Sequence, residues 1–471
     1  MGLVGSTSIK RPREEPEVIE NNDEDEKDLE DEVEEISPRR KKIKTTSAYI
    51  YETFFEQGTH SDVVIHALDK EWKLHKTYLA QSEYFSSMFS GQWKESSENV
   101  ISLEIPDPNI DIEALDLAFS SMYRDIVPVT MDRICPTVAA ATMLQLDGLM
   151  QHCVVYMKEN LCADSVVHFR ITSSMYGMVE IFSRCNQWLK MNLLVSATTT
   201  LLKDLSCDLF AELLGSPDLF MMQVEMDAYS LAKKWLFLKL HPLWDGDLHQ
   251  LSANADDYFK LLGEETDIDY LDTEDGQQYI PAFKQIRLIH VVTDPGSIVV
   301  LNTDRIIPKD WLSPVYEKLW VKMLLVDQRV DQGPAALSPA QFDALSLRCG
   351  RVLTDVSDYC WRWTGYSYGI DILVNYTHGY NQSSTMSVKR NTRSQPCISS
   401  VSFQPVRLTM LKMSVVSFSD YGEIDETWDS GTLSLYLSPD EEKTILTLDS
   451  PIKFPLYISV NMALVSAEHL Q

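Results

Sequence analysis

The side chains that usually carry catalysis occur in this chain of 471 residues, but their spacing is not that of an active site. His152 and Cys153 are adjacent, and neighbours along a helix point to different faces, so they form a poor nucleophile–base pair. There is no His-Glu-x-x-His motif and no phosphate loop ending in Gly-Lys-Ser or Gly-Lys-Thr. The eight cysteines include no Cys-x-x-Cys pair, which argues against a zinc site or a disulfide framework. We therefore expect a non-enzymatic protein without a metal or cofactor.

Negative charge is concentrated near the N-terminus. Residues 14–35 contain 14 acidic residues and one lysine, within a chain of net charge −29. Dense charge and few aromatic residues over 1–48 predict a disordered tail. The chain lacks the basic balance that nucleic-acid binding needs, so we expect no direct contact with DNA or RNA.

The tail contains three candidate targeting signals. Two basic clusters fit a nuclear import signal or, alternatively, solvated charges that balance the acidic run. They consist of Lys10, Arg11, Arg13, Arg39, Arg40, Lys41, Lys42 and Lys44. Gly2 and Ser6 fit an N-myristoylation pattern, which would give a weak membrane contact; a chance glycine is the other interpretation. Ser37 precedes a proline beside the second cluster, where a phosphate would add negative charge.

Residues 49–160 have the pattern of a small α/β domain. Two short strands surround an Asp69-Lys70 turn, and helical spacing dominates after residue 106. The phrases Ser-Asp-Val, Leu-His-Lys, Ser-x-Tyr-Phe-x-x-Met-Phe and Ala-Ala-x-Met-Leu-Gln-Leu-Asp-Gly-Leu resemble the BTB (POZ) fold in order and spacing. This resemblance implies a homodimer formed through an apolar helical face.

One loop of this domain suggests a partner. Residues 88–96 resemble the loop in which BTB adaptors of cullin-3 ubiquitin ligases carry an apolar-x-Glu motif. By this resemblance Trp93 would fill an apolar slot on cullin-3, Glu95 would hydrogen-bond to it, and Tyr123 would face it as well. The chain departs from the family after Tyr123, where Arg124-Asp125 replaces the common Thr-Gly. The alternative is a tryptophan that packs on its own loop.

Apolar residues recur at helical intervals over residues 161–295. This part resembles the BACK domain that follows BTB in cullin-3 adaptors, where it extends the cullin contact. An acidic and less periodic stretch over 244–280 predicts a loop or insertion. Residues 282–290 predict the last helix of this part.

The apolar period changes to two within residues 310–471, after a helix near Tyr316, which predicts a β-rich, sandwich-like domain. A kelch propeller is not expected, because the chain has no Gly-Gly doublet. The aromatic row 359–369 resembles the C-terminal domain of germ cell-less proteins, and the resemblance extends over about residues 48–471. Roughly half of these rings should face away from the core. Candidate client-binding residues are Arg362, Tyr366 and Tyr368, whereas Trp361 and Trp363 fit a core role better.

The predicted fold class is thus α+β and multidomain, with a tail, a BTB domain, a helical BACK-like domain and a β-rich end. The resemblance implies a cullin-3 adaptor that recruits a client protein for ubiquitination, with a role in germ-cell development or spermatogenesis. It also implies the nucleus, its envelope or matrix, with a plasma-membrane or cortical pool. The alternative is a nuclear-envelope scaffold or transcriptional co-regulator that binds transcription-factor or lamina-associated proteins without cullin.

Overall fold

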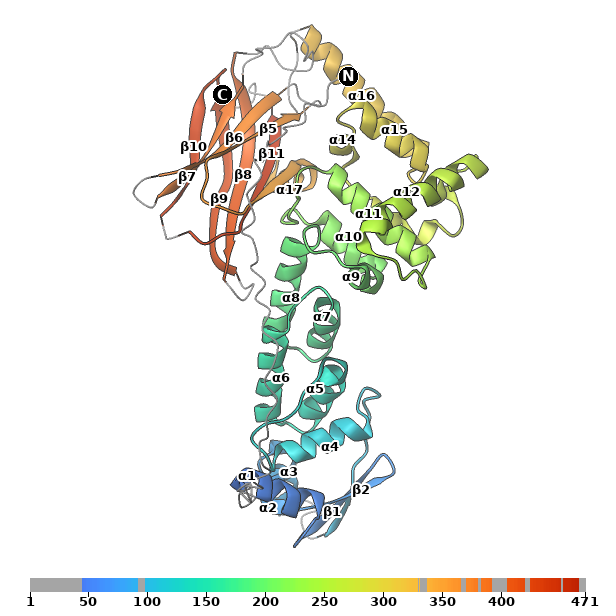
Figure 1. Cartoon of the computed structure of the whole chain (residues 1–471), viewed down its shortest axis with the longest axis vertical. Helices are drawn as coiled ribbons and strands as arrows, with labels where there is room; N and C mark the ends of the chain where they lie inside the picture. Colours follow the sequence, from blue (N-terminus) through green and yellow to red (C-terminus); the bar gives the residue numbers. More distant parts are fainter. Residues whose placement is uncertain are drawn as a thin grey trace, which may run out of the picture. The chain divides into compact units, whose positions relative to one another are not determined.

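The computed structural model describes residues 45–91, 98–328, 330, 337–365, 370–379, 383–391, 405–419, 424–449 and 452–465. Within these residues the chain has a small α/β unit, a run of helices and two four-stranded sheets (Figure 1). The predicted α+β multidomain fold class is confirmed. Among the described residues, no helix is both long and apolar enough to cross a membrane.

A three-stranded sheet with the order β2-β1-β3 forms the centre of the α/β unit. β1 (Val63–Ala67) pairs antiparallel with β2 (Lys70–Leu74) and parallel with β3 (Val100–Ser102). Leu68 and Asp69 connect the first two strands with φ angles of 47° and 61°. Two successive positive φ angles are what a type I′ hairpin turn requires.

Helices pack on this sheet and share its hydrophobic core. They are α1 (Thr46–Ile50), the π-helix η1 (Tyr51–Glu56), α2 (Lys76–Leu79), α3 (Glu83–Phe89), α4 (Ile112–Ser121), α5 (Ile134–Met143) and α6 (Asp147–Glu159). Phe85 of α3 and Phe119 of α4 are fully buried, and the ring of Phe119 lies 5.2 Å from that of Trp72 on β2. These apolar contacts hold α3 and α4 against the strands.

A run of helices follows. They are α7 (Val166–Met175), α8 (Val179–Asn192), α9 (Thr199–Asp204), α10 (Cys207–Gly215), α11 (Met226–Leu240), α12 (Leu248–Glu265), α13 (Ile280–Phe283), α14 (Leu288–Val291), α15 (Pro295–Asp304), α16 (Lys309–Asp327) and α17 (Pro339–Leu345). Trp235 of α11 is fully buried 4.6 Å from the ring of Phe210, and its indole N–H donates to the carbonyl of Leu205. The indole therefore adds packing to the core without leaving a buried donor unpaired.

The stretch 244–280, predicted to be a loop or insertion, contains the 18-residue helix α12. Its buried residues Leu251, Ala255 and Phe259 repeat every four positions, which is a narrow stripe on one helix face. Acidic and polar residues on the other faces diluted the apolar pattern. The prediction was wrong for this segment.

Two other expectations differ from the structure. The helix predicted over 282–290 is divided into α13 and α14 by residues 284–287. The helix expected near Tyr316 is part of α16, but the helical region continues through α17, and the first strand begins only at Leu347. The helix signal near Tyr316 therefore belongs to a longer helical region.

The C-terminal strands form two antiparallel sheets, with the orders β10-β7-β6-β5 and β4-β11-β8-β9. The strands are β4 (Leu347–Leu353), β5 (Tyr359–Gly365), β6 (Ile370–His378), β7 (Ser384–Arg390), β8 (Arg407–Phe418), β9 (Ile424–Leu437), β10 (Glu442–Leu448) and β11 (Leu456–Val465). Val374 and Val388 of one sheet share a buried core with Val415 and Ile458 of the other. The two sheets are therefore packed as a sandwich, as predicted (Figure 1).

Candidate partner-binding site

Tyr123 lies just after α4 and is 2% exposed. Its hydroxyl accepts the backbone N–H of His75 at 3.0 Å and lies 3.1 Å from Nδ1 of the same histidine. Nε2 of His75 is 2.9 Å from the carbonyl oxygen of Thr59, which can only accept. We therefore assign the imidazole proton to Nε2, so that the Tyr123 hydroxyl donates to Nδ1. Burial raises the pKa of Tyr123, which keeps this donor protonated.

The ring of Tyr123 is enclosed by other aromatic rings. It stacks on Tyr78 with centroids 4.4 Å apart and lies 5.4 Å from Phe55. A ring enclosed in this way offers almost no surface to a partner, so the predicted contact between Tyr123 and cullin-3 is not available in this geometry. Tyr123 instead holds η1, α2 and the end of α4 together.

Beside Tyr123 lies a groove of 390 Å³, which we call the acidic groove. Its walls come from the α2–α3 junction, the segment that follows α4, and the α5–α6 turn. The Gln81 amide donates to the carbonyl of Met122 at 2.9 Å, and the Ser82 hydroxyl donates to that of Leu144 at 2.5 Å. These two bonds tie the α2–α3 junction to both of the other walls.

The acidic groove has an excess of negative charge. Glu83, Asp125 and Asp147 line it, and Arg124 is its single arginine. The Arg124 guanidinium lies 4.7 Å over the ring of Tyr51 and donates to a serine hydroxyl near the end of α4. Across the described part of the chain, no basic side chain is within ion-pair distance of the three carboxylates. Arg124 is thus used within the fold and leaves the acids uncompensated.

A second groove, of 550 Å³, adjoins the first, and we call it the apolar groove. Both grooves are lined by Glu83 and by residues 145–147 of the α5–α6 turn. Met150 of α6 and Met178 lie along the apolar groove, as does Val179, which is 78% exposed at the start of α8. The two grooves therefore form one continuous surface: Glu83 and Asp147 line both of them, and the apolar groove adds Glu180 beside its methionines.

The wall formed by the α7–α8 turn is fixed to the segment between β3 and α4. The Tyr176 hydroxyl donates to Asp107 at 2.9 Å and accepts from the Asn109 amide at 2.9 Å. Burial and the hydrogen bond to Asp107 raise the pKa of Tyr176 to about 12. Gly177 follows with a φ of 69°, a left-handed conformation that favours glycine.

The predicted cullin-binding residues Trp93 and Glu95 lie outside the described residues, in 92–97. The segment that carries them leaves the C-terminal end of α3, and Glu83 at the other end of α3 lines both grooves. α3 has seven residues, so its two ends are about 10 Å apart. One short helix therefore connects the predicted motif to the grooves.

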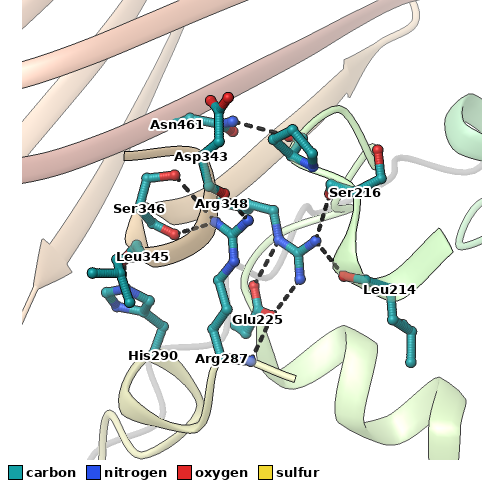
Figure 2. Close-up of polar contacts among 11 residues, drawn as sticks. Leu214, Ser216, Glu225, Arg287, His290, Asp343, Leu345, Ser346, Arg348 and Asn461 are labelled. Atoms are coloured by element: carbon teal, nitrogen blue, oxygen red, sulfur yellow. Dashed lines mark hydrogen bonds and ion pairs between the residues drawn. The ribbon is translucent and has the colours of Figure 1, made fainter. Parts of the chain in front are cut away.

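Figure 2 shows a buried polar junction between the helical region and the sandwich, which the sequence did not predict. Glu225 and Arg348 are 0% and 1% exposed in their side chains. Two hydrogen bonds of 3.1 and 2.5 Å join the guanidinium to the carboxylate. Arg348 also donates to the carbonyls of Leu214 and Ser216 at 2.7 and 2.8 Å. Each of the three guanidinium nitrogens of this β4 arginine therefore has an acceptor in the helical region.

Arg287 and His290 extend the same junction (Figure 2). The backbone N–H of Arg287 donates to Glu225, and its guanidinium donates to the carbonyl of Ser346. Burial, with repulsion from the neighbouring Arg348, lowers the pKa of Arg287 to about 10. His290 Nε2 donates to the carbonyl of Leu345 at 2.8 Å, and burial lowers the pKa of His290 to about 4.

The candidate client-binding residues lie on or near β5. Arg362 forms a bidentate contact with Asp371 of β6, with distances of 2.6 to 3.0 Å, and its side chain is 42% exposed. Trp363 is 7% exposed in the sandwich core, and Trp361 is half-buried against it. The rings of 359, 361 and 363 are therefore on the core side, so the predicted outward rings are not found among them. Tyr366 and Tyr368 lie outside the described residues.

A third groove, of 610 Å³, lies between α8 and the sheet containing β8, β9 and β11. Lys412 of β8 lies in it, 3.1 Å from Asp218 and 4.0 Å from Asp429. The positive charge of Lys412 is thus balanced by these two acidic residues. The sequence did not indicate this groove, because its walls come from segments more than 200 residues apart.

His152 and Cys153 have separate roles in the fold. His152 Nε2 donates to the carbonyl of Val127 at 3.0 Å, and burial raises the pKa of the Cys153 thiol to about 12. No group of three His, Cys, Asp or Glu residues that could hold a metal occurs among the described residues.

Residues 365–369 read Gly-Tyr-Ser-Tyr-Gly, which is the spacing of a nucleophile elbow. A Gly-x-Ser-x-Gly nucleophile elbow joins a strand to a helix. Here the segment joins the antiparallel strands β5 and β6, which pair Gly365 with Ile370. A connection between two strands is not the structural context of a nucleophile elbow.

The tail predictions also lie outside the described residues. They concern Gly2, Ser37 and the two basic clusters, including Lys44. They remain predictions.

Residues 51–161 match the BTB/POZ domain family, so the fold defines a BTB protein with a helical region and a β-sandwich after the BTB domain. Over 92% of its length the chain is 44% identical to "Germ cell-less protein-like 1" of Mus musculus and 43% identical to the Homo sapiens protein of that name, covering 82% and 83% of them. It is 33% identical to "Protein germ cell-less" of Drosophila melanogaster, over 91% of the chain and 78% of that protein. The chain belongs to the germ cell-less family. Its BTB domain and family fit an adaptor or scaffold role.

Proposed function

We propose that this protein is a substrate-specific adaptor of a cullin-3 ubiquitin ligase. The observation that carries the proposal is the continuous surface formed by the acidic and apolar grooves next to α3. A concave surface that is part charged and part apolar suits a protein partner. The segment with Trp93 and Glu95 leaves the same helix, where an aromatic anchor would supply the main binding energy.

Catalysis in this proposal is by proximity. The BTB domain forms a homodimer and holds cullin-3, and the sandwich end holds the client protein. BTB domains commonly mediate dimerisation and partner binding, which supports this division of labour. Two client sites in a dimer raise the local concentration of client at the ligase without any chemistry by the chain itself.

The client surface is proposed on the sandwich, at Arg362 and the neighbouring Tyr366 and Tyr368. Since Arg362 is already paired with Asp371, its exposed portion would contact the client while the ion pair keeps it in place. Replacing Arg362 by Lys removes the bidentate geometry and should weaken client capture, whereas cullin-3 recovery should not change.

The proposed setting is the nucleus and its envelope, with a cortical pool and a role in germ-cell development. The tail signals are proposed to direct this distribution. Comparing the location of the natural chain with Gly2→Ala and with a variant in which both basic clusters are replaced by Ala separates lipid targeting from nuclear import. An unchanged distribution in both variants would exclude both signals.

A pull-down with cullin-3 tests the proposed function. The full chain should recover cullin-3, and Trp93→Ala/Glu95→Ala should lose at least about 90% of it, as expected for an interface anchor. Trp320→Ala is the matched control, because Trp320 is 62% exposed on α16, far along the chain from the BTB domain. Equal recovery by the double variant would remove the loop from the mechanism. No recovery by any form would favour the scaffold without cullin.

A further inference from the structure

The strand β5 lies at the edge of its sheet. In the order β10-β7-β6-β5 it pairs with β6 from end to end without a register shift. Among the described residues, no other segment forms backbone hydrogen bonds with its second edge. An edge strand presents a row of backbone N–H and C=O groups with which another strand can pair.

The hydrogen bonds of β6 show which backbone groups of β5 face this free edge. Asn391 donates its backbone N–H to the carbonyl of Asp371, so the odd-numbered residues of β6 are bonded to β7 and the even-numbered ones to β5. The register pairs these even-numbered residues with the odd-numbered residues of β5. The backbone groups of Cys360, Arg362 and Thr364 therefore point away from β6.

The other three edges of the described sheets have features that hinder pairing. β4 lies against the helical region, where a Cβ on Gly350 would be 2.2 Å from the carbonyl oxygen of Met221. β9 and β10 both have register shifts in their pairing with the neighbouring strand. β5 contains no proline, and its one charged residue, Arg362, is paired with Asp371. Of these four edges, that of β5 is therefore the best suited to accept a further strand.

The side chains of β5 indicate the composition of such a strand. Tyr359, Trp361 and Trp363 stack with ring centroids 5.9 and 6.5 Å apart, which is close to the spacing of alternate residues along a strand. Tyr359 and Trp361 are only partly buried, so apolar side chains at alternate positions of an added strand would cover them. On the opposite face Arg362, whose side chain is 42% exposed, favours an acidic side chain across from it.

Resting on the proposed function, we propose that the client binds through an extended segment that pairs antiparallel with the free edge of β5. The segment alternates apolar with polar residues and places an acidic residue opposite Arg362. A second copy of this chain fits the edge poorly, because antiparallel pairing over the whole of β5 would place Arg362 opposite Arg362. In strand addition of this kind the main-chain hydrogen bonds supply affinity and the alternate side chains supply specificity.

A synthetic peptide tests the pairing on the protein side. The probe is fluorescein-labelled Ser-Val-Thr-Val-Glu-Val-Thr-Val-Ser, and its binding to the full chain is measured by fluorescence anisotropy. Cys360→Pro removes one outward N–H but no hydrogen bond to β6, and Cys360→Ala is the matched control that keeps the N–H. We expect Cys360→Pro to weaken binding at least about 10-fold and Cys360→Ala to bind as the natural chain does. Equal affinity of the two variants, or no binding by the natural chain, would overturn the pairing.

N-methylated peptides keep the test decisive if Cys360→Pro does not fold. With the glutamate opposite Arg362, the backbone nitrogens of the glutamate and threonines face β5 and those of the valines face away. Methylation of the first set should abolish binding to the natural chain, and methylation of the valine nitrogens should not. The same effect from both sets would contradict strand addition.

Failure of this pairing and failure of the adaptor function are distinguishable. If the natural chain recovers cullin-3 but the peptide results contradict the pairing, the client binds in another way and the adaptor function stands. If the peptide results agree with the pairing but no cullin-3 is recovered, β5 is a strand-binding edge of a scaffold that acts without cullin.

Discussion

At the scale of single residues, a cluster of charged side chains is buried between the helical region and the sandwich. Glu225 receives hydrogen bonds from Arg287 and Arg348, which are 62 and 123 positions away along the chain. Such a separation leaves no local pattern, so sequence periodicity could not predict the junction. Tyr123 is similar. Resemblance to the family predicted that it faces cullin-3, and only the fold shows that its hydroxyl is bonded to His75.

Replacing Glu225 by Gln should destabilise the protein by about 3–5 kcal/mol, because two arginines lose the buried charge that compensates them. Glu212→Gln is the matched control. Its partner Arg170 is near the surface and the Glu212 side chain is 58% exposed, so the change should cost no more than about 1 kcal/mol. Denaturant unfolding followed by fluorescence would measure both. Equal unfolding midpoints for the two variants would show that the junction around Glu225 contributes little to the stability of the protein.

His290 predicts how stability depends on pH. Its pKa is lowered from 6.5 to about 4 in the folded protein, so between these values the unfolded state binds a proton that the folded state does not. As the pH falls from about 6.5 to 4, the free energy of unfolding therefore decreases by about 3 kcal/mol because of His290.

The variant His290→Gln isolates this contribution, because its amide can still donate to the carbonyl of Leu345 but does not titrate. Unfolding free energies measured between pH 7 and pH 4 should fall more steeply for the natural chain than for the variant. Parallel curves would contradict the assignment of a buried neutral imidazole.

At the scale of elements, prediction from sequence was best where a local pattern specified the structure. The alternation of β1 and β2 predicted the hairpin, although its turn lies at Leu68-Asp69 and not at the predicted Asp69-Lys70. The period of two predicted the sandwich. α12 was missed because its stripe of Leu251, Ala255 and Phe259 is narrow and its other faces are acidic. The two grooves were missed because each is assembled from several elements, none of which has an unusual sequence.

Two glycines at the edges of the grooves should respond in opposite directions to the same change. Gly177→Ala places a Cβ on a residue with a φ of 69° and should cost about 1 kcal/mol. Gly148→Ala lies near the start of α6 and should stabilise it by up to about 1 kcal/mol. A Cβ meets nothing within 4 Å at either position, so the difference is conformational. Thermal unfolding of both variants checks the signs; a stabilised Gly177→Ala would exclude the left-handed turn.

At the scale of the whole molecule, a helical region lies in the chain between the BTB domain and the sandwich, and the proposed function assigns partner binding to the first and client binding to the second. The buried junction around Glu225 attaches β4 to the helical region through hydrogen bonds and an ion pair. The family was recognisable from the sequence because its motifs are local. The buried contacts between the helical region and the sandwich were not recognisable from the sequence, because they join residues that are far apart along the chain.

The most direct measurement is the mass and composition of the complex in solution, by size-exclusion chromatography with light scattering. Alone, the chain should elute with twice its 53.8 kDa mass. With cullin-3 it should form a complex of two chains and two cullins, and Trp93→Ala/Glu95→Ala should remain a dimer that binds no cullin. A natural chain that dimerises but never joins cullin-3 would contradict the central claim.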